Sequence, residues 1–349
     1  MIESFRKGLQ QWYEFNKRSL PWRQTKKPYL IWLSEIILQQ TRVEQGLPYF
    51  EAFSKMYPTV FDLATAKEEE VLKLWQGLGY YSRARNLHET AKYIVEELNG
   101  EFPKSYDGLI QLKGVGPYTA AAIASFCYDE PRAVVDGNVY RVLARIFGIH
   151  TPINSSLGIK EFQQLANELL DPKKPSTHNQ AMMEFGSQQC KPKAALCEKC
   201  FFNEKCYAYQ KNAVSEFPVK EKKLKIKKRS FYYYIVLDSQ KRTLLNKRVR
   251  KDIWQNLYDF LLIEQDEQPS IEDIKKLLAQ KGIHDLQKLW AWNEHPVVHK
   301  LSHQELSVSF TVLEVTDNLE EYKEAVHWSE LQSYAVPVLI ENFINRFKI

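Results

Sequence analysis

The segment LKGVGPYTAAAIASF, residues 112–126, decides the fold that this sequence predicts. We expect one helix to end at Lys113 and a second helix, built from small residues, to begin near Tyr118. Between them, Gly114 and Gly116 permit a tight backbone turn. Such a helix–hairpin–helix presents backbone N–H groups at a helix N-terminus, where they can bind a phosphate without reading a base. The alternative is an ordinary glycine turn between packed helices.

An aspartate follows this hairpin at a distance of about twenty residues. In AVVDGNVYRVLARIFG (133–148), Asp136 comes after two β-branched residues and before Gly137, which is the position of a helix N-cap. Capping alone would account for it, although one carboxylate can both cap a helix and take part in a reaction. The placement after the hairpin favours a functional role.

A second carboxylate, Glu35, lies in one of the most apolar runs of the chain, IWLSEIILQQTRV (31–43). On a helix, its neighbours three and four residues away include no Lys or Arg to pair with it. One explanation is a helix edge, where Glu35 reaches past its neighbours to water. The other is a buried acid whose apolar surroundings raise its pKa. We expect Gln40 to lie one turn further along the same helix.

Four of the five cysteines lie together in CKPKAALCEKCFFNEKC (190–206), with the spacing C-x6-C-x2-C-x5-C. Four thiols so near in sequence, in a chain with no sign of secretion, indicate a metal site rather than disulfides. Zinc sites commonly use two short C-x2-C pairs, whereas here only one pair is close. A [4Fe–4S] cluster therefore fits better, with zinc as the alternative. The expected ligands are Cys190, Cys197, Cys200 and Cys206.

Composition and length set the broad class of the protein. The 349 residues suggest two or three domains, and the net charge of +5 is mildly basic and compatible with a polyanionic partner. Seven of the ten residues 220–229 (KEKKLKIKKR) are Lys or Arg, which suits a solvated linker or a phosphate-binding strap. The N-terminal segment MIESFRKGLQQWYEF has no uninterrupted apolar stretch of the kind found in a signal peptide, and no run in the sequence approaches the length of a membrane span. We therefore expect a cytoplasmic protein.

The character of the chain changes after this basic segment. Residues 1 to about 212 show the three-four apolar spacing of successive helices. Beyond it, FYYYIVLD (231–238) and ELSVSFTVLEV (305–315) are typical of strands, and SIEDIKKLLAQKG (270–282) is typical of a capped amphipathic helix. We therefore predict an all-helical part followed by a small α+β domain.

Taken in order, the hairpin, the VDGNV aspartate and the four cysteines resemble the endonuclease-III-like superfamily of DNA glycosylases. Within it, the resemblance is to MutY-type adenine DNA glycosylases, and it rests on six segments: LPWR (20–23), WLSEIILQQTRV (32–43), GLGYYSRARNL (77–87), GVGPYTAAAI (114–123), VDGNVYRVLAR (135–145) and NQAMMEFG (179–186). It covers essentially the whole helical part and extends more weakly into the C-terminal part.

This resemblance implies a multidomain fold in four parts. An iron–sulfur cluster subdomain would comprise residues 1–21 and 131–212, and a helical subdomain with the hairpin would comprise 22–130. A basic linker, 213–229, would lead to a MutT-like (Nudix-like) domain at 230–349 that recognises 8-oxoguanine. The expected partner is double-stranded DNA with adenine opposite 8-oxoguanine or guanine, bound by a monomer that associates with the nucleoid.

The same resemblance assigns roles around a flipped-out adenine. Glu35 would be the acid that protonates the leaving base, and Asp136 the carboxylate that stabilises charge on the sugar. The other positions are Tyr118 and Asn138, which would orient the carboxylates and the sugar; Trp22, Arg23 and Gln180 in the base pocket; and Gln40 and Tyr80 as wedges in the duplex. Core packing is the alternative for Trp22 and Tyr80.

One position bears on the type of reaction. Bifunctional relatives with lyase activity carry a lysine where this chain has Tyr118, and a tyrosine cannot form a Schiff base with the sugar. We therefore expect a monofunctional glycosylase. One alternative is a bifunctional glycosylase/lyase. The other is a non-catalytic iron–sulfur DNA-binding protein, in which Glu35 and Asp136 only cap a helix or contact water.

The C-terminal part lacks the acidic metal-binding array of Nudix hydrolases, so it should bind rather than cut. KLSHQ (300–304) resembles the Phe-Ser-His loop with which the family contacts the oxidised base. Leu301 replaces the aromatic residue, which puts stacking in doubt, while Ser302 and His303 are present. The alternative for these three residues is a surface loop with no ligand.

Overall fold

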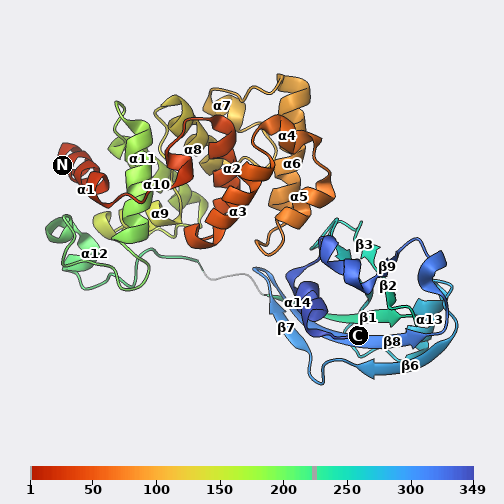
Figure 1. The fold of residues 1–349 in the computed structure, drawn as a ribbon. Coiled ribbons are helices and arrows are strands. Elements are labelled where there is room, and N and C mark those ends of the chain that lie inside the picture. The colour runs from red at the N-terminus through yellow and green to blue at the C-terminus, as the bar shows by residue number, and fades with distance from the viewer. Residues whose placement is uncertain (1, 222–225) are drawn as a thin grey trace. The chain divides into compact units, whose positions relative to one another are not determined.

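The computed structural model describes residues 2–221 and 226–349, so part of the basic segment 220–229 lies outside the described residues. Up to residue 212 the chain is helical, as predicted (Figure 1). The helices are α1 Ile2–Asn16, η1 Pro21–Arg23, α2 Pro28–Leu38, α3 Val43–Met56, α4 Val60–Thr65, α5 Glu68–Leu74, α6 Ser82–Leu98, α7 Tyr106–Leu109, α8 Pro117–Tyr128, α9 Gly137–Phe147, α10 Ser156–Leu169, α11 Pro175–Gln188, η2 Asn203–Lys205 and α12 Tyr207–Gln210.

The predicted hairpin joins α7 to α8, but its first helix ends at Leu109 rather than at Lys113. Beyond Leu109 the chain tightens into short turns, in which Leu112 N donates to the Leu109 carbonyl at 3.2 Å. Gly114 has a φ of +75°, and a Cβ there would lie 2.8 Å from the Cβ of Asn86. A side chain is therefore excluded both by backbone conformation and by space.

The run that carries Glu35 also breaks earlier than predicted. Helix α2 ends at Leu38, and Gln40 adopts a left-handed φ of +55°, so Gln40 is not on the helix of Glu35. The break lets α3 fold back against α2. Gly46 of α3 marks the close approach, since a Cβ there would lie 2.8 Å from a methyl carbon of Leu38.

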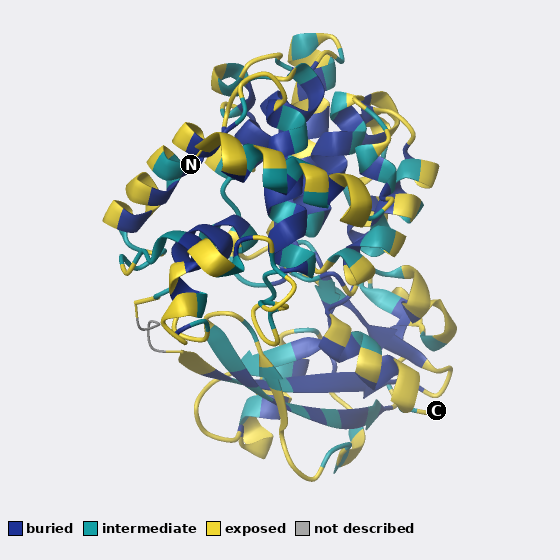
Figure 2. Ribbon diagram, turned by 90° about the vertical axis from the view of Figure 1, so that its left-hand side faces the viewer, coloured by how far each residue is buried: buried dark blue, intermediate teal, exposed yellow. Residues whose placement is uncertain are grey.

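The N-terminal helix packs with the last helices of this region. A single buried cluster includes residues of α1, α9, α10, α11 and the segment around α12, among them Leu9, Leu143, Phe162, Phe185 and Phe202. Figure 2 shows such buried residues along the inner faces of the helices. The two ends of the helical region are thus held together by apolar burial.

The C-terminal part is an α+β domain, as predicted. Its strands and helices are β1 Lys227–Leu237, β2 Arg242–Leu244, β3 Asn246–Lys247, β4 Tyr258–Asp259, β5 Leu261–Glu264, α13 Ile271–Ala279, β6 Leu286–Ala291, β7 Val297–Lys300, β8 Gln304–Val315, η3 Leu319–Glu321, β9 Ala325–His327, η4 Trp328–Ser333 and α14 Val338–Arg346. The main sheet has the order β5-β1-β8-β6, with β7 also paired to β8. Strands β1 and β8 are parallel, with Phe231 beside Val308, and the other pairings of this sheet are antiparallel.

The two central strands carry apolar side chains on both faces. On one face, Phe310 of β8 stacks on Phe343 of α14, with ring centroids 4.6 Å apart. Leu313 of β8, an odd number of residues away, lies on the other face and packs in one cluster with Ile274 and Leu278 of α13. A helix therefore covers each face of the sheet.

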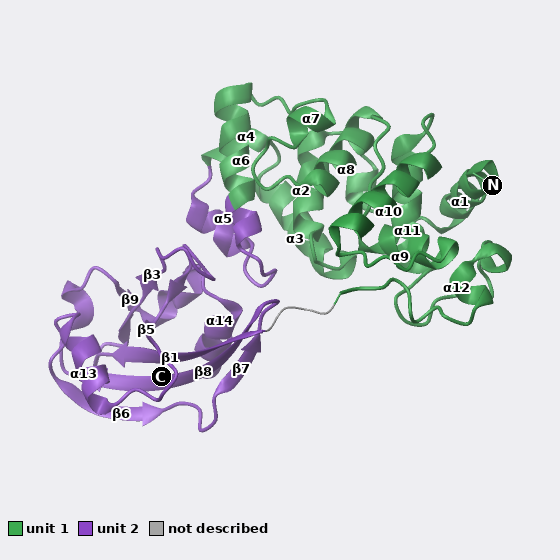
Figure 3. Ribbon diagram, turned by 180° about the vertical axis from the view of Figure 1, so that it is seen from behind, with its two compact units in different colours: residues 1–65, 86–222 green, residues 66–85, 223–349 purple. Residues whose placement is uncertain are grey.

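The chain divides into two units (Figure 3). We call residues 1–65 and 86–222 the helical unit, and residues 66–85 and 223–349 the C-terminal unit. The C-terminal unit thus includes α5 and the turn after it. Within the described residues, none of the helices combines the length and the apolar character needed to cross a membrane.

Candidate active site

The helical unit contains a cavity of about 150 Å³, which we call the Glu35 cavity. Seven residues predicted from the sequence line it: Trp22, Arg23, Glu35, Tyr118, Asp136, Asn138 and Gln180. They come from η1, α2, α8, α9 and α11, or from the residues next to these helices. The fold therefore brings together side chains that are up to about 160 residues apart in sequence.

Glu35 is buried, with 5% of its surface exposed. Burial raises the pKa of its carboxyl to about 7, and the negative charge of Asp136 adds to this, while a hydrogen bond from Tyr118 and the charge of Arg23 act in the opposite direction. The explanation of Glu35 as an exposed helix edge is therefore wrong. A carboxyl group with this pKa still carries a proton in a large fraction of molecules near neutral pH.

Asp136 is the N-cap of α9, as predicted. One oxygen accepts from the backbone N–H groups of Asn138 at 2.8 Å and Val139 at 2.7 Å, and the other accepts from the Asn138 side chain at 2.7 Å. Burial raises the pKa of Asp136 above its ordinary value, and these three hydrogen bonds and the nearby Arg141 counteract part of that rise by favouring the ionised form. Its surroundings thus differ from those of Glu35, which accepts from Tyr118.

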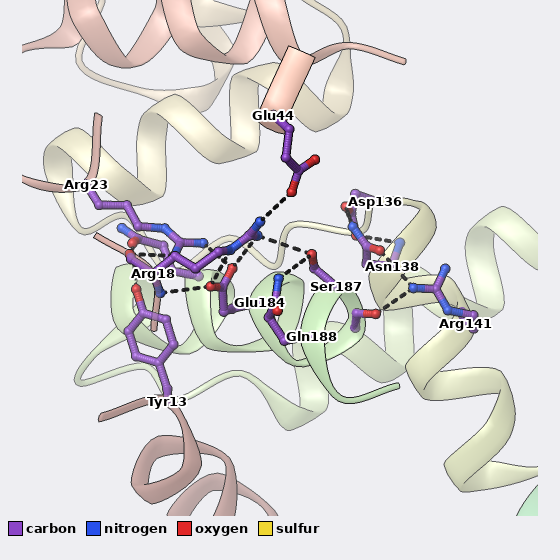
Figure 4. A network of polar contacts seen from close by, with 12 residues as sticks. Tyr13, Arg18, Arg23, Glu44, Asp136, Asn138, Arg141, Glu184, Ser187 and Gln188 are labelled. Atoms are coloured by element: carbon purple, nitrogen blue, oxygen red, sulfur yellow. Dashed lines mark hydrogen bonds and ion pairs between the residues drawn. The ribbon is translucent and has the colours of Figure 1, made fainter. Parts of the chain in front are cut away.

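Asn138 also connects the cavity to the segment of the four cysteines. Its Oδ1 accepts from Nη2 of Arg141 at 2.8 Å (Figure 4). Arg141 Nε in turn donates to the carbonyl oxygen of Cys190 at 2.8 Å. The same guanidinium donates to the carbonyl oxygen of Gly186 at 2.6 Å. Arg141 was not predicted as a site residue, although it follows Asn138 by three residues on α9, where the two side chains share a face.

The three predicted pocket residues differ in their surroundings. Trp22 is buried and packs edge-on against the Phe50 ring, with centroids 5.1 Å apart, and it also lines the cavity. Gln180 accepts from the Tyr13 hydroxyl at 2.9 Å. Arg23 donates to the carboxylate of Glu184 at 2.8 Å. For Trp22, core packing and a place in the cavity wall are both correct descriptions.

Sequence reasoning missed two charged residues of this cavity, Arg18 and Glu184. Arg18 binds Glu184 through its backbone N–H and two guanidinium nitrogens, at 2.8–2.9 Å (Figure 4). A signal for Glu184 was available, because it follows Gln180 by four residues and therefore lies on the same face of α11. Nothing comparable marked Arg18, which lies in the irregular segment before η1.

The two expected wedges are both exposed and both have left-handed backbone conformations, with φ of +55° at Gln40 and +48° at Tyr80. Tyr80 is 45% exposed, so core packing does not explain it. Within the C-terminal unit its hydroxyl is hydrogen-bonded to the hydroxyl of Ser302. Leu301, Ser302 and His303 form the turn between β7 and β8, in which Leu301 N donates to the Gln304 carbonyl at 2.8 Å.

The hairpin presents the start of α8 to its surroundings. Gly116 is the N-cap of α8, is exposed, and has open space where a Cβ would lie. The first N–H groups of a helix have no acceptor within the helix. This end of α8 therefore has room for an anion to approach the backbone.

The four clustered cysteines have free thiols and line one small cavity, which we call the cysteine cavity. Arg145 Nη1 donates to Sγ of Cys190 at 3.4 Å, and the backbone N–H of Phe202 donates to Sγ of Cys200 at 3.4 Å. Among the described residues, no three His, Cys, Asp or Glu side chains converge on a point where one metal ion would bind. The four sulfur donors and the N–H groups directed at two of them suit a group larger than one ion, with several sulfur ligands.

Comparison with known proteins adds to this geometry. The sequence model of the HhH-GPD superfamily base excision DNA repair proteins matches residues 33–168, and that of the NUDIX domain matches residues 232–346. The adenine DNA glycosylase of Buchnera aphidicola subsp. Schizaphis graminum is 31% identical over 356 residues, which cover 99% of each chain.

Two further comparisons concern the helical part. The adenine DNA glycosylase of Rattus norvegicus is 44% identical over 219 residues, which cover 60% of this chain and 42% of that protein. The match thus spans less than half the length of the rat relative. A solved thermostable thymine-DNA glycosylase superposes with a TM-score of 0.56 at 29% identity, covering 60% of this chain and 97% of that one.

Proposed function

Because the chain belongs to the adenine DNA glycosylase family, we propose that it hydrolyses the N-glycosidic bond of adenine in a DNA mispair and releases the free base. The observation that carries this proposal is the pair of carboxyl groups in unlike surroundings on one cavity, with Glu35 at a pKa of about 7 and Asp136 held by three hydrogen bonds. Two carboxyl groups whose environments separate their protonation states are the usual basis for acid and anion roles at one site.

The residues of the cavity suggest how the bond breaks. Glu35 donates its proton to a ring nitrogen of adenine, so that the base departs with the bonding electron pair as a neutral molecule. The carboxylate of Asp136 stabilises the positive charge that develops on the sugar, and water then completes the hydrolysis. Tyr118 and Asn138 hold the two carboxyl groups in place, while Trp22, Arg23 and Gln180 contact the base.

Binding to double-stranded DNA involves both units in this proposal. The N-terminal end of α8, with Gly114 and Gly116, binds a backbone phosphate. Gln40 and Tyr80 fill the space left by the flipped nucleotide. The NUDIX domain recognises 8-oxoguanine or guanine opposite the adenine, through the turn that contains Leu301, Ser302 and His303. The hydrogen bond between Tyr80 and Ser302 supports a common role for these two side chains.

Adenine release is the direct test of this proposal. The purified chain, in excess over a labelled duplex, should release adenine placed opposite 8-oxoguanine or guanine and leave adenine opposite thymine intact. In a variant without residues 226–349, the preference for 8-oxoguanine as the opposite base should fall by a larger factor than the rate of adenine release. No adenine release from any duplex would reject the proposed activity.

The reaction should stop at the abasic site, because the chain has Tyr118 where a lyase needs an amine. Borohydride added during turnover should trap no covalent complex, and the abasic strand should remain intact until it is treated with alkali. Efficient trapping by the pure protein would instead support the bifunctional glycosylase/lyase alternative.

We further infer that Cys190, Cys197, Cys200 and Cys206 bind a [4Fe–4S] cluster. The support is four free thiols around one cavity, two of which accept N–H hydrogen bonds. The cluster would tie the segment after α11 to the rest of the helical unit, and no step of base release depends on it. Iron and acid-labile sulfide in a ratio of one to one, about four of each per chain, are expected on analysis, whereas stoichiometric zinc would support the alternative.

A further inference from the structure

Glu184 of α11 is the most completely buried charged group of the Glu35 cavity. Its side chain has no exposed surface. One oxygen accepts from Arg18 N at 2.9 Å and Arg18 Nε at 2.8 Å, and the other accepts from Arg18 Nη2 and Arg23 Nη2, both at 2.8 Å. Four hydrogen bonds therefore saturate the carboxylate, and they tie the segment between α1 and α2 to α11 (Figure 4).

These contacts also determine the charge of this part of the cavity wall. The two guanidiniums carry two positive charges, and Glu184 neutralises one of them. Burial by itself would raise the pKa of Glu184, but the hydrogen bonds from Arg18 and Arg23 outweigh it and lower the pKa to about 2. Glu184 is therefore ionised near neutral pH, and one net positive charge remains on the pair of guanidiniums.

That remaining charge acts on Glu35. Arg23 lies close enough to Glu35 to lower the pKa of its carboxyl, against the larger effect of burial. A second uncompensated guanidinium on the same wall would lower it further, because charges in a poorly solvated cavity interact strongly. The protonated form of Glu35, which the proposed reaction needs, would then be scarce at neutral pH.

We propose that Glu184 is a positioning residue, which holds Arg18 and Arg23 along the wall of the base pocket and neutralises one of their two charges so that Glu35 keeps its proton. This inference rests on the proposed function and extends it, because it adds a residue that acts through Arg23 and Glu35 rather than on the base. Ser187 belongs to the same arrangement, since its hydroxyl accepts from Arg18 at 3.1 Å.

The charged and titratable groups around Glu35 come from several elements. They are Arg18 and Arg23 before α2, Glu44 of α3 beside Arg18, Tyr118 and Cys127 of α8, Asp136 at the start of α9, and Glu184 of α11. Of the acidic groups, only Glu44 is largely exposed, with 77% of its side chain accessible and 3.6 Å between it and Arg18. Glu44 is therefore the matched control for Glu184, because it pairs with the same arginine but is exposed to solvent.

The test is the pH profile of single-turnover adenine release from a duplex with adenine opposite 8-oxoguanine. The rate should fall as pH rises through the pKa of Glu35. In Glu184→Gln this fall should move to lower pH by roughly one unit, so that the variant loses most activity at pH 8 and regains part of it at pH 6. Glu44→Gln should keep the wild-type profile, because its charge is screened by water.

Two further variants separate charge from positioning. Arg18→Gln together with Glu184→Gln restores one net positive charge, so its profile should return toward the wild-type midpoint even if the rate stays low. Arg18→Gln alone should move the decrease in rate to higher pH. This variant still tests the inference if Glu184→Gln does not fold. Circular dichroism establishes the folding of each variant.

The outcomes distinguish this inference from the proposed function. A wild-type chain that releases no adenine would reject both. An active wild type, with folded variants whose rates change by the same factor at every pH, would reject the role of Glu184 and leave the proposed function standing. Shifts in the two stated directions would support the inference.

Discussion

Two parts of the Glu35 cavity each contain a buried glutamate, and they shift the pKa of its carboxyl group in opposite directions. The part formed by α2 and α8 surrounds Glu35 with apolar residues and one hydroxyl donor, and burial raises its pKa to about 7. The part formed by α11 and the segment before η1 surrounds Glu184 with two guanidiniums, and its pKa falls to about 2. One glutamate can thus act as an acid and the other as a permanent anion, because partners rather than burial decide the outcome.

The largest effect should come from removing the proton donor. Glu35→Gln keeps the size of the side chain but cannot protonate adenine, so we expect adenine release to slow by about 100-fold or more. Single-turnover kinetics at pH 7 provide the measurement, with Glu44→Gln as the control. A folded Glu35→Gln chain with the wild-type rate would remove Glu35 from the mechanism.

The next prediction concerns Glu184, the buried anion of this comparison, and its effect on stability. Glu184→Leu leaves Arg18 and Arg23 without their shared carboxylate, and their side chains are only 26% and 14% exposed. We expect the free energy of unfolding to fall by roughly 2–4 kcal/mol, because breaking a buried ion pair leaves uncompensated charge. Denaturant unfolding measures this loss, and Glu44→Gln should lose less than about 1 kcal/mol. Equal losses in the two variants would show that the buried network adds no stability.

Replacing Glu35 should change how the stability of the protein depends on pH. In the unfolded chain Glu35 ionises near its ordinary pKa of 4.5, whereas in the folded chain it keeps its proton up to about 7. Between these values the folded state binds more protons, so the wild type loses stability as pH rises. Glu35→Gln lacks this loss, and it should exceed the wild type by at most about 3 kcal/mol above pH 7 and by nothing below pH 4. Unfolding curves at both pH values would show a constant difference if Glu35 were not titrating.

The smallest effect should come from Tyr118→Phe. The hydroxyl of Tyr118 donates a hydrogen bond that lowers the pKa of Glu35. Its loss should move the high-pH fall of the reaction upward by roughly half a pH unit, opposite in direction to Glu184→Gln. The pH profile of adenine release measures the shift. A shift to lower pH would contradict the hydrogen-bond assignment.

Local rules explain which elements could be predicted. The N-cap at Asp136 and the capping box of α13, in which Ser270 accepts from the N–H of Asp273, follow from side chains next to the backbone groups that they satisfy. The end of α2 did not follow, because nothing local forbids a helix through Gln40. The close packing of α3 on α2 selects the turn there, and a sequence pattern does not contain that contact.

Sequence patterns alone predicted a helical part followed by an α+β part, several of their helices and strands, and the family to which the chain belongs. These rest on periodicity, capping and ordered motifs, which are local properties or sums of them. Only folding shows that Glu35 is buried, and that Glu184 keeps its negative charge although its side chain is fully buried. The partners of Glu184 lie 166 and 161 residues away in sequence. The pKa of a carboxyl group depends on the charges and the water around it, and only folding brings those charges into place and excludes that water.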